Sequence, residues 1–108
     1  YWEGTVNRAV KLPGGKAVIH IQARGDQAYD VWPYMIVELD GEEIGETFVG
    51  SSKWKEYSFE VDTEGGIKVL SVTFPNDGGD WERGIDRNLY VGKVKITQMK
   101  NRDYTDER

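Results

Sequence analysis

The chain has 108 residues, with 19 acidic and 14 basic side chains and a formal net charge of −5. Because it contains no cysteine, it can form neither a disulfide scaffold nor a cysteine-ligated zinc finger, and its acidic balance argues against a nucleic-acid partner. No apolar run approaches the length of about 18 residues that a membrane-spanning helix needs. We therefore expect one compact domain without a membrane partner.

Apolar and polar side chains alternate along most of the chain, which is the two-residue period of β-strands, and almost nothing recurs at helical spacing. The pair Asp40 and Gly41 is the strongest hairpin signal. Short strands separated by glycine-bearing turns are typical of an all-β sandwich. In chain order, we expect strands over residues 5–12, 17–24, 35–39, 44–49, 57–62, 68–74, 89–91 and 93–97.

These strands predict an all-β fold, an antiparallel β-sandwich of jelly-roll-like form. We expect residues 1–100 to form this single domain. The stretch 101–108 is polar apart from Tyr104 and is predicted to be a C-terminal tail.

One glycine-rich loop, residues 76–88, carries four carboxylates: Asp77, Asp80, Glu82 and Asp86. Carboxylates at this density repel one another unless a cation lies among them, and calcium prefers oxygen ligands in flexible geometry. The spacing does not match an EF-hand, because the sixth position counted from Asp77 is Glu82 and not glycine. From the residues alone, a cation site and an acidic, solvated hairpin loop both remain open.

Aromatic side chains gather at two loops: Trp81 lies within the acidic loop, and Tyr29, Trp32 and Tyr34 surround the start of the strand over 35–39. An exposed aromatic ring beside polar acceptors suits the apolar face of a sugar. Two alternatives to sugar binding remain open. Trp32 could belong to the core, and the Trp81 side chain could fold back to cover the loop.

Catalytic interpretations are weaker. His20 is the only histidine, and a single histidine in a strand is expected to be a packed or surface residue. Asp77 and Asp86 suggest a glycosidase pair, but an ionic, wet loop does not keep one acid protonated. We therefore do not expect an enzyme.

The segments Val-Thr-Phe-Pro-Asn-Asp at 72–77 and Asp-Arg-Asn-Leu-Tyr-Val at 86–91 resemble the signature of calcium-dependent, xylan-binding carbohydrate-binding modules of families 36 and 60. Further pieces at 14–17, 23–25, 31–35 and 37–41 agree in order, so the resemblance covers roughly residues 6–96. It implies a β-sandwich of the kind usually appended to secreted plant-cell-wall hydrolases.

The resemblance also implies a ligand set. A calcium ion in the acidic loop would be held by Asp77, the Trp81 carbonyl and the Glu82 carboxylate, and would bind hydroxyls O2 and O3 of a sugar. Asp86 would be a further ligand or a brace for the loop. Tyr29, Trp32 or Tyr34 would flank that sugar. Glu82 stands where closer relatives have an aspartate, and Gly92 replaces an aspartate that helps to hold a second, structural calcium.

We therefore expect a secreted, monomeric, non-catalytic module that binds a β-linked polysaccharide, xylan before others, through calcium. It would be tethered to a secreted glycoside hydrolase or a cell-surface protein, and its start at Tyr1 agrees with a piece of a longer chain. The alternative from another class is a structural or adhesion domain that calcium stiffens and that binds a protein.

Overall fold

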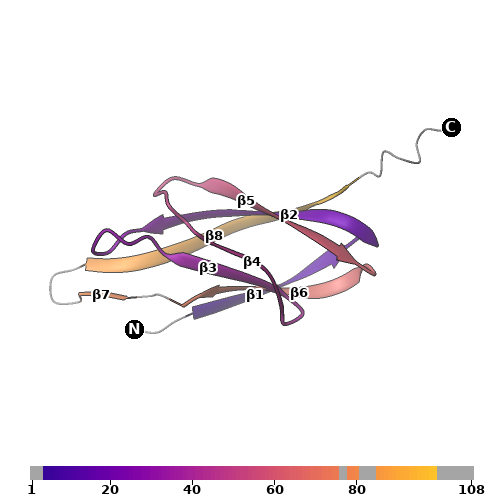
Figure 1. Ribbon diagram of the computed structural model, residues 1–108, viewed down its shortest axis with the longest axis horizontal. Helices are drawn as coiled ribbons and strands as arrows, with labels where there is room; N and C mark the ends of the chain where they lie inside the picture. The colour runs from indigo at the N-terminus through magenta and orange to yellow at the C-terminus, as the bar shows by residue number, and fades with distance from the viewer. Residues whose placement is uncertain (1–3, 76–77, 81–84, 100–108) are drawn as a thin grey trace.

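Two antiparallel four-stranded sheets form the fold in the computed structural model, which describes residues 4–75, 78–80 and 85–99 (Figure 1). One sheet has the strand order β1-β6-β3-β4 and the other has the order β5-β2-β8-β7. The antiparallel β-sandwich predicted from the sequence is confirmed. The strands are β1 (Gly4–Leu12), β2 (Gly15–Asp26), β3 (Tyr34–Leu39), β4 (Glu42–Phe48), β5 (Lys55–Thr63), β6 (Gly66–Phe74), β7 (Gly78–Asp80) and β8 (Ile85–Gln98).

The core lies between the two sheets and is built from the predicted alternation. On β2, every second side chain is buried, at Ala17, Ile19, Ile21 and Ala23. The facing sheet contributes buried side chains from β3 and β6, including Met35, Val37, Leu39, Leu70 and Val72. Burial of each large aliphatic side chain stabilises the fold by about 1.5–3 kcal/mol.

The prediction of separate strands over 89–91 and 93–97 is wrong, because β8 is one continuous strand. The side chains of β8 that pack on the core lie at odd-numbered positions in its first part, Leu89 and Val91, and at even-numbered positions further on, Val94 and Ile96. The register against β2 shifts at the same place, where β8 has two residues opposite Gln22 alone. A β-bulge reverses the facing of side chains without ending the strand.

The hairpin predicted at residues 40–41 is confirmed between β3 and β4. Asp40 and Gly41 have φ angles of 51° and 85°, and two-residue hairpin turns of type I′ need positive φ at both positions. The Asp40 Oδ1 accepts a hydrogen bond from the Val69 N–H at 2.7 Å, which joins the turn to β6.

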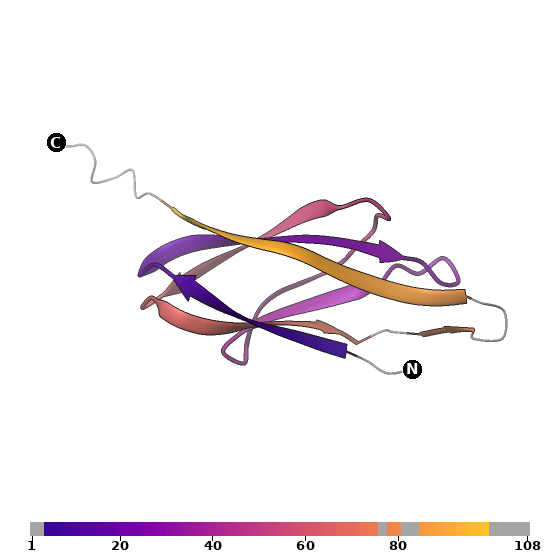
Figure 2. The same ribbon diagram turned by 180° about the vertical axis from the view of Figure 1, so that it is seen from behind.

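Several segments that are distant in the sequence meet at one end of the sandwich, which we call the hairpin end. It contains the connection from β2 to β3 (residues 27–33), β7 and the first residues of β8, and Figures 1 and 2 show these segments together from both sides. Along the described ranges, no helix long and apolar enough to cross a membrane is found.

Candidate calcium and glycan site

The acidic loop is built on a β-hairpin. Strands β7 and β8 pair antiparallel, with Gly78 opposite Arg87, Gly79 opposite Asp86 and Asp80 opposite Ile85. Paired strands lie about 4.7–4.9 Å apart, so the backbones of residues 78–80 and 85–87, which include Asp80 and Asp86, are held side by side. Of the predicted calcium ligands, Asp86 lies on β8, whereas Asp77, Trp81 and Glu82 lie outside the described residues. The predicted donors are all oxygens, which suits calcium.

Asp26 joins β2 to β8 beside this hairpin. Its Oδ2 accepts hydrogen bonds from the Asn88 Nδ2 at 3.3 Å and from the Tyr90 hydroxyl at 3.0 Å. Asn88 and Tyr90 belong to the motif at 86–91, so two of its polar side chains fix the base of the hairpin. Sequence reasoning missed Asp26 because its partners are more than 60 residues away along the chain. The spacing of two between Asn88 and Tyr90 does place both on one face of a strand.

Tyr29 is presented at the tip of a tight turn. The backbones of Ala28 and Val31 exchange two hydrogen bonds, of 3.1 and 3.0 Å, and Tyr29 and Asp30 between them have φ angles of 54° and 63°. This left-handed region is unfavourable for residues other than glycine, and such strain clusters at functional sites. The Tyr29 side chain is 56% exposed. The turn therefore favours the predicted contact between Tyr29 and a ligand.

Replacement of Tyr29 by glycine should change stability and binding of the expected polysaccharide in opposite directions. Glycine relieves the left-handed backbone, which outweighs its greater freedom in the unfolded chain by about 0.5–1 kcal/mol. The melting temperature should rise by a few degrees in calorimetry, while the affinity for the expected polysaccharide falls because the ring is gone. Tyr29→Phe, which keeps both the ring and the strain, is the matched control. A Tyr29→Gly variant with full affinity would exclude Tyr29 from the site.

Trp32 and Tyr34 are the other two aromatic residues predicted to flank the sugar, and they lie shortly after this turn in the chain. Trp32 is half-buried and lies beside the Gly50 backbone, so it is neither a fully buried core residue nor a fully exposed one. Tyr34 begins β3, and its ring packs edge-on against Phe48 at 4.8 Å. Its hydroxyl donates a hydrogen bond to the Glu46 carboxylate, which raises the pKa of Tyr34 to about 12. The phenol is therefore a neutral group at any physiological pH.

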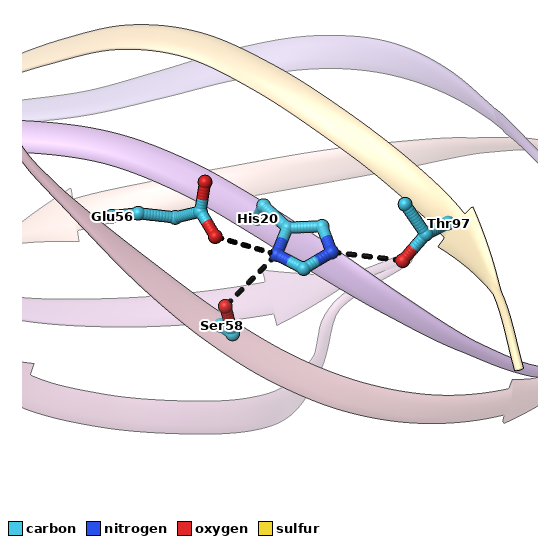
Figure 3. Close-up of polar contacts among 4 residues, drawn as sticks. All are labelled: His20, Glu56, Ser58 and Thr97. Atoms are coloured by element: carbon cyan, nitrogen blue, oxygen red, sulfur yellow. Dashed lines mark hydrogen bonds and ion pairs between the residues drawn. The ribbon is translucent and has the colours of Figure 1, made fainter.

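His20 lies on the outer face of the β5-β2-β8 sheet and contacts polar side chains on both neighbouring strands (Figure 3). Its Nδ1 lies 3.0 Å from Glu56 Oε2 and 2.9 Å from Ser58 Oγ, and its Nε2 lies 2.8 Å from Thr97 Oγ1. Both ring nitrogens are thus engaged with neighbouring strands. This agrees with the prediction of a packed or surface histidine.

Gly92 is packed closely by two side chains, one from β1 and one from the segment just before β5. The Arg8 guanidinium on β1 donates to the Gly92 carbonyl at 2.9 Å, and a Cβ at position 92 would lie 3.1 Å from the Trp54 ring. The group that approaches from β1 is therefore a cation. The described geometry gives no support for a second calcium at this position.

A β-sandwich with an oxygen-rich hairpin and several aromatic side chains at one end has the arrangement of a polysaccharide-binding module. A sequence model of the family CBM60, described as calcium-dependent, xylan-binding carbohydrate-binding modules, matches residues 18–107. The chain therefore belongs to this family, as the motif at 86–91 suggested. Membership of this family identifies the chain as a carbohydrate-binding module that binds xylan and depends on calcium. Comparisons with curated proteins and with solved structures gave no match.

Proposed function

We propose that the chain captures xylan through a calcium ion held in residues 76–88. The observation that supports this most directly is the pairing of β7 with β8, which holds the backbones of residues 78–80 and 85–87 side by side. Asp77, the Trp81 carbonyl, Glu82 and Asp86 are the proposed ligands. When bound, a hard cation supplies coordination positions for two neighbouring hydroxyls, O2 and O3, of one sugar.

The chain's own residues orient the sugar and the loop. Asp26, through Asn88 and Tyr90, fixes the start of β8 against β2. Tyr29 and Trp32, on the neighbouring connection, offer ring surface to the apolar face of the sugar, and Tyr34 stands at the end of that connection. Xylose in a β-1,4 chain leaves O2 and O3 free and lacks the C6 group. A shallow site of this kind should bind with a Kd of about 10⁻³–10⁻⁶ M.

The same proposal places the module outside the cell as a monomer without activity of its own, attached to a glycoside hydrolase or a surface protein that acts at xylan. Support comes from the family match and from the nature of the polymer, which occurs in plant cell walls. Incubation of the purified module with xylan should release no sugar.

Calcium removal tests the proposal. Electrophoresis of the protein through native gels that contain xylan should show retardation with calcium, loss of retardation with EDTA, and recovery when calcium is restored. We expect this result because the sugar hydroxyls coordinate the calcium ion, so the protein without calcium lacks the group that binds them. Gels without polysaccharide control for changes in charge and shape. Retardation that EDTA leaves unchanged would refute calcium-mediated capture.

A further inference from the structure

A second aromatic surface lies on the outer face of the β5-β2-β8 sheet. Trp54, just before β5, is 49% exposed. An ideal Cβ at Gly92 on β8 would lie 3.1 Å from its Cζ3 and 3.3 Å from its Cη2. The ring therefore rests on backbone that only glycine leaves clear. The Trp54 side chain is therefore in contact with β8 and still offers about half of its surface to solvent.

Arg24 connects this ring to a second one. Its guanidinium carbon lies 5.2 Å from the centroid of the Trp54 ring and 4.1 Å from that of Tyr90. A guanidinium at these distances is attracted to the faces of both rings. We call Trp54, Arg24 and Tyr90 the aromatic row. The Tyr90 hydroxyl donates to Asp26, so the row ends at the same carboxylate that fixes the base of the hairpin.

Within the row, Trp54 lies at a distance from the hairpin that suits a chain and not a single sugar. Asn88, at the base of the hairpin, and Gly92, beneath Trp54, are four residues apart on β8, which is about 13 Å along a strand. Only a ligand of several linked sugars can touch both places. Xylan is such a ligand, and it is neutral, so it is not repelled by the Arg24 cation.

We propose that the aromatic row is a second sugar-binding subsite, at which the part of the Trp54 ring that Arg24 and Gly92 leave exposed packs against a xylose unit of the same xylan chain that calcium holds at the hairpin. This rests on the proposed function. The contact needs no metal, because an apolar sugar face packs on an aromatic ring while hydroxyls meet the polar edge of the sheet. The Trp54 ring already contacts Gly92 and Arg24, so little side-chain entropy is lost when the sugar binds. Arg24 and Gln22 supply donors on the same face.

Ligand length separates this subsite from the calcium site. Titration calorimetry in calcium compares xylobiose, which reaches one site only, with xylohexaose, which spans both. Trp54→Ala should lower the affinity for xylohexaose by about three- to tenfold and leave that for xylobiose unchanged. Trp54→Phe, which keeps a ring, should restore much of the loss. Ile67→Ala is the matched control, since Ile67 is an apolar side chain on β6 of the other sheet and is 75% exposed.

Each outcome decides the proposal. Equal affinities of wild type and Trp54→Ala for xylohexaose would overturn the second subsite while leaving calcium capture intact. Parallel losses for both sugars, or a fall in melting temperature that Trp54→Phe does not repair, would assign Trp54 a structural role instead and also overturn it. If EDTA does not weaken xylobiose binding, calcium capture fails, whereas a length-dependent loss in Trp54→Ala would still support the subsite.

Discussion

Substitution of Asp77 by alanine should lower the affinity for xylan by about a hundredfold or more, equivalent to about 2.7 kcal/mol. The proposed site depends on this carboxylate to hold the metal, and the sugar hydroxyls depend on the metal. The melting temperature without calcium should stay within a few degrees of wild type, since the buried core residues come from other positions. Titration calorimetry with calcium and then with xylohexaose measures both effects.

The control for Asp77→Ala is Asp62→Ala. Asp62 is an exposed carboxylate on β5 that lines an open hollow with Glu64 and Lys68, so its loss changes the net charge equally. This variant should keep wild-type affinity. If Asp77→Ala binds xylan as tightly as Asp62→Ala, Asp77 is no ligand. If it is unfolded at room temperature, the acidic loop is mainly structural.

Gly25→Ala should damage stability and binding together. An ideal Cβ at position 25 would lie 2.4 Å from Pro33 Cγ and 2.9 Å from its Cδ, distances that real contacts essentially never show. Overpacking of this kind costs about 1–3 kcal/mol, or about 5–15 °C in melting temperature for a domain of this size. Pro33 ends the connection that carries Tyr29 and Trp32, so its displacement should also lower the affinity for xylan.

Gly50→Ala controls for the loss of a glycine in the same region. A Cβ there would meet only Trp32 Cδ1, at 3.9 Å, an ordinary contact. Its melting temperature should stay near that of wild type. A Gly25→Ala protein as stable as Gly50→Ala would mean that the Pro33 ring moves aside at little cost, and the close packing of Gly25 would then not position the connection.

The sheets and their core could be predicted because the period of two is strong where one face is buried. Ile19 and Ile21 alternate with polar or half-exposed neighbours, and the structure buries both fully. The turn at Asp40 was equally predictable, since its chemistry is local. The bulge at Gly92 was not, because a reversal of facing looks the same in sequence as a strand end, and only pairing with β2 shows that the strand continues.

The candidate site was predictable only through the resemblance. Acidic residues and glycines in 76–88 fit a solvated hairpin as well as a cation site, and the residue types alone do not distinguish the two. Asp26 contacts Tyr90, and Trp54 contacts Gly92. The order of the strands in the sheet brings these residues together, and no local sequence pattern indicates such contacts. Their roles follow from topology, which a linear sequence does not display.

The single imidazole of the chain gives the molecule a built-in spectroscopic reporter. His20 lies on β2 two positions from Gln22 and four from Arg24, on the outer face that carries the aromatic row, and its ring bonds to β5 and β8 at once. Its two carbon-bound protons give one isolated pair of nuclear magnetic resonance signals. A xylan chain that arrives beside Trp54 would shift that pair, whereas one confined to the hairpin tip would leave it in place.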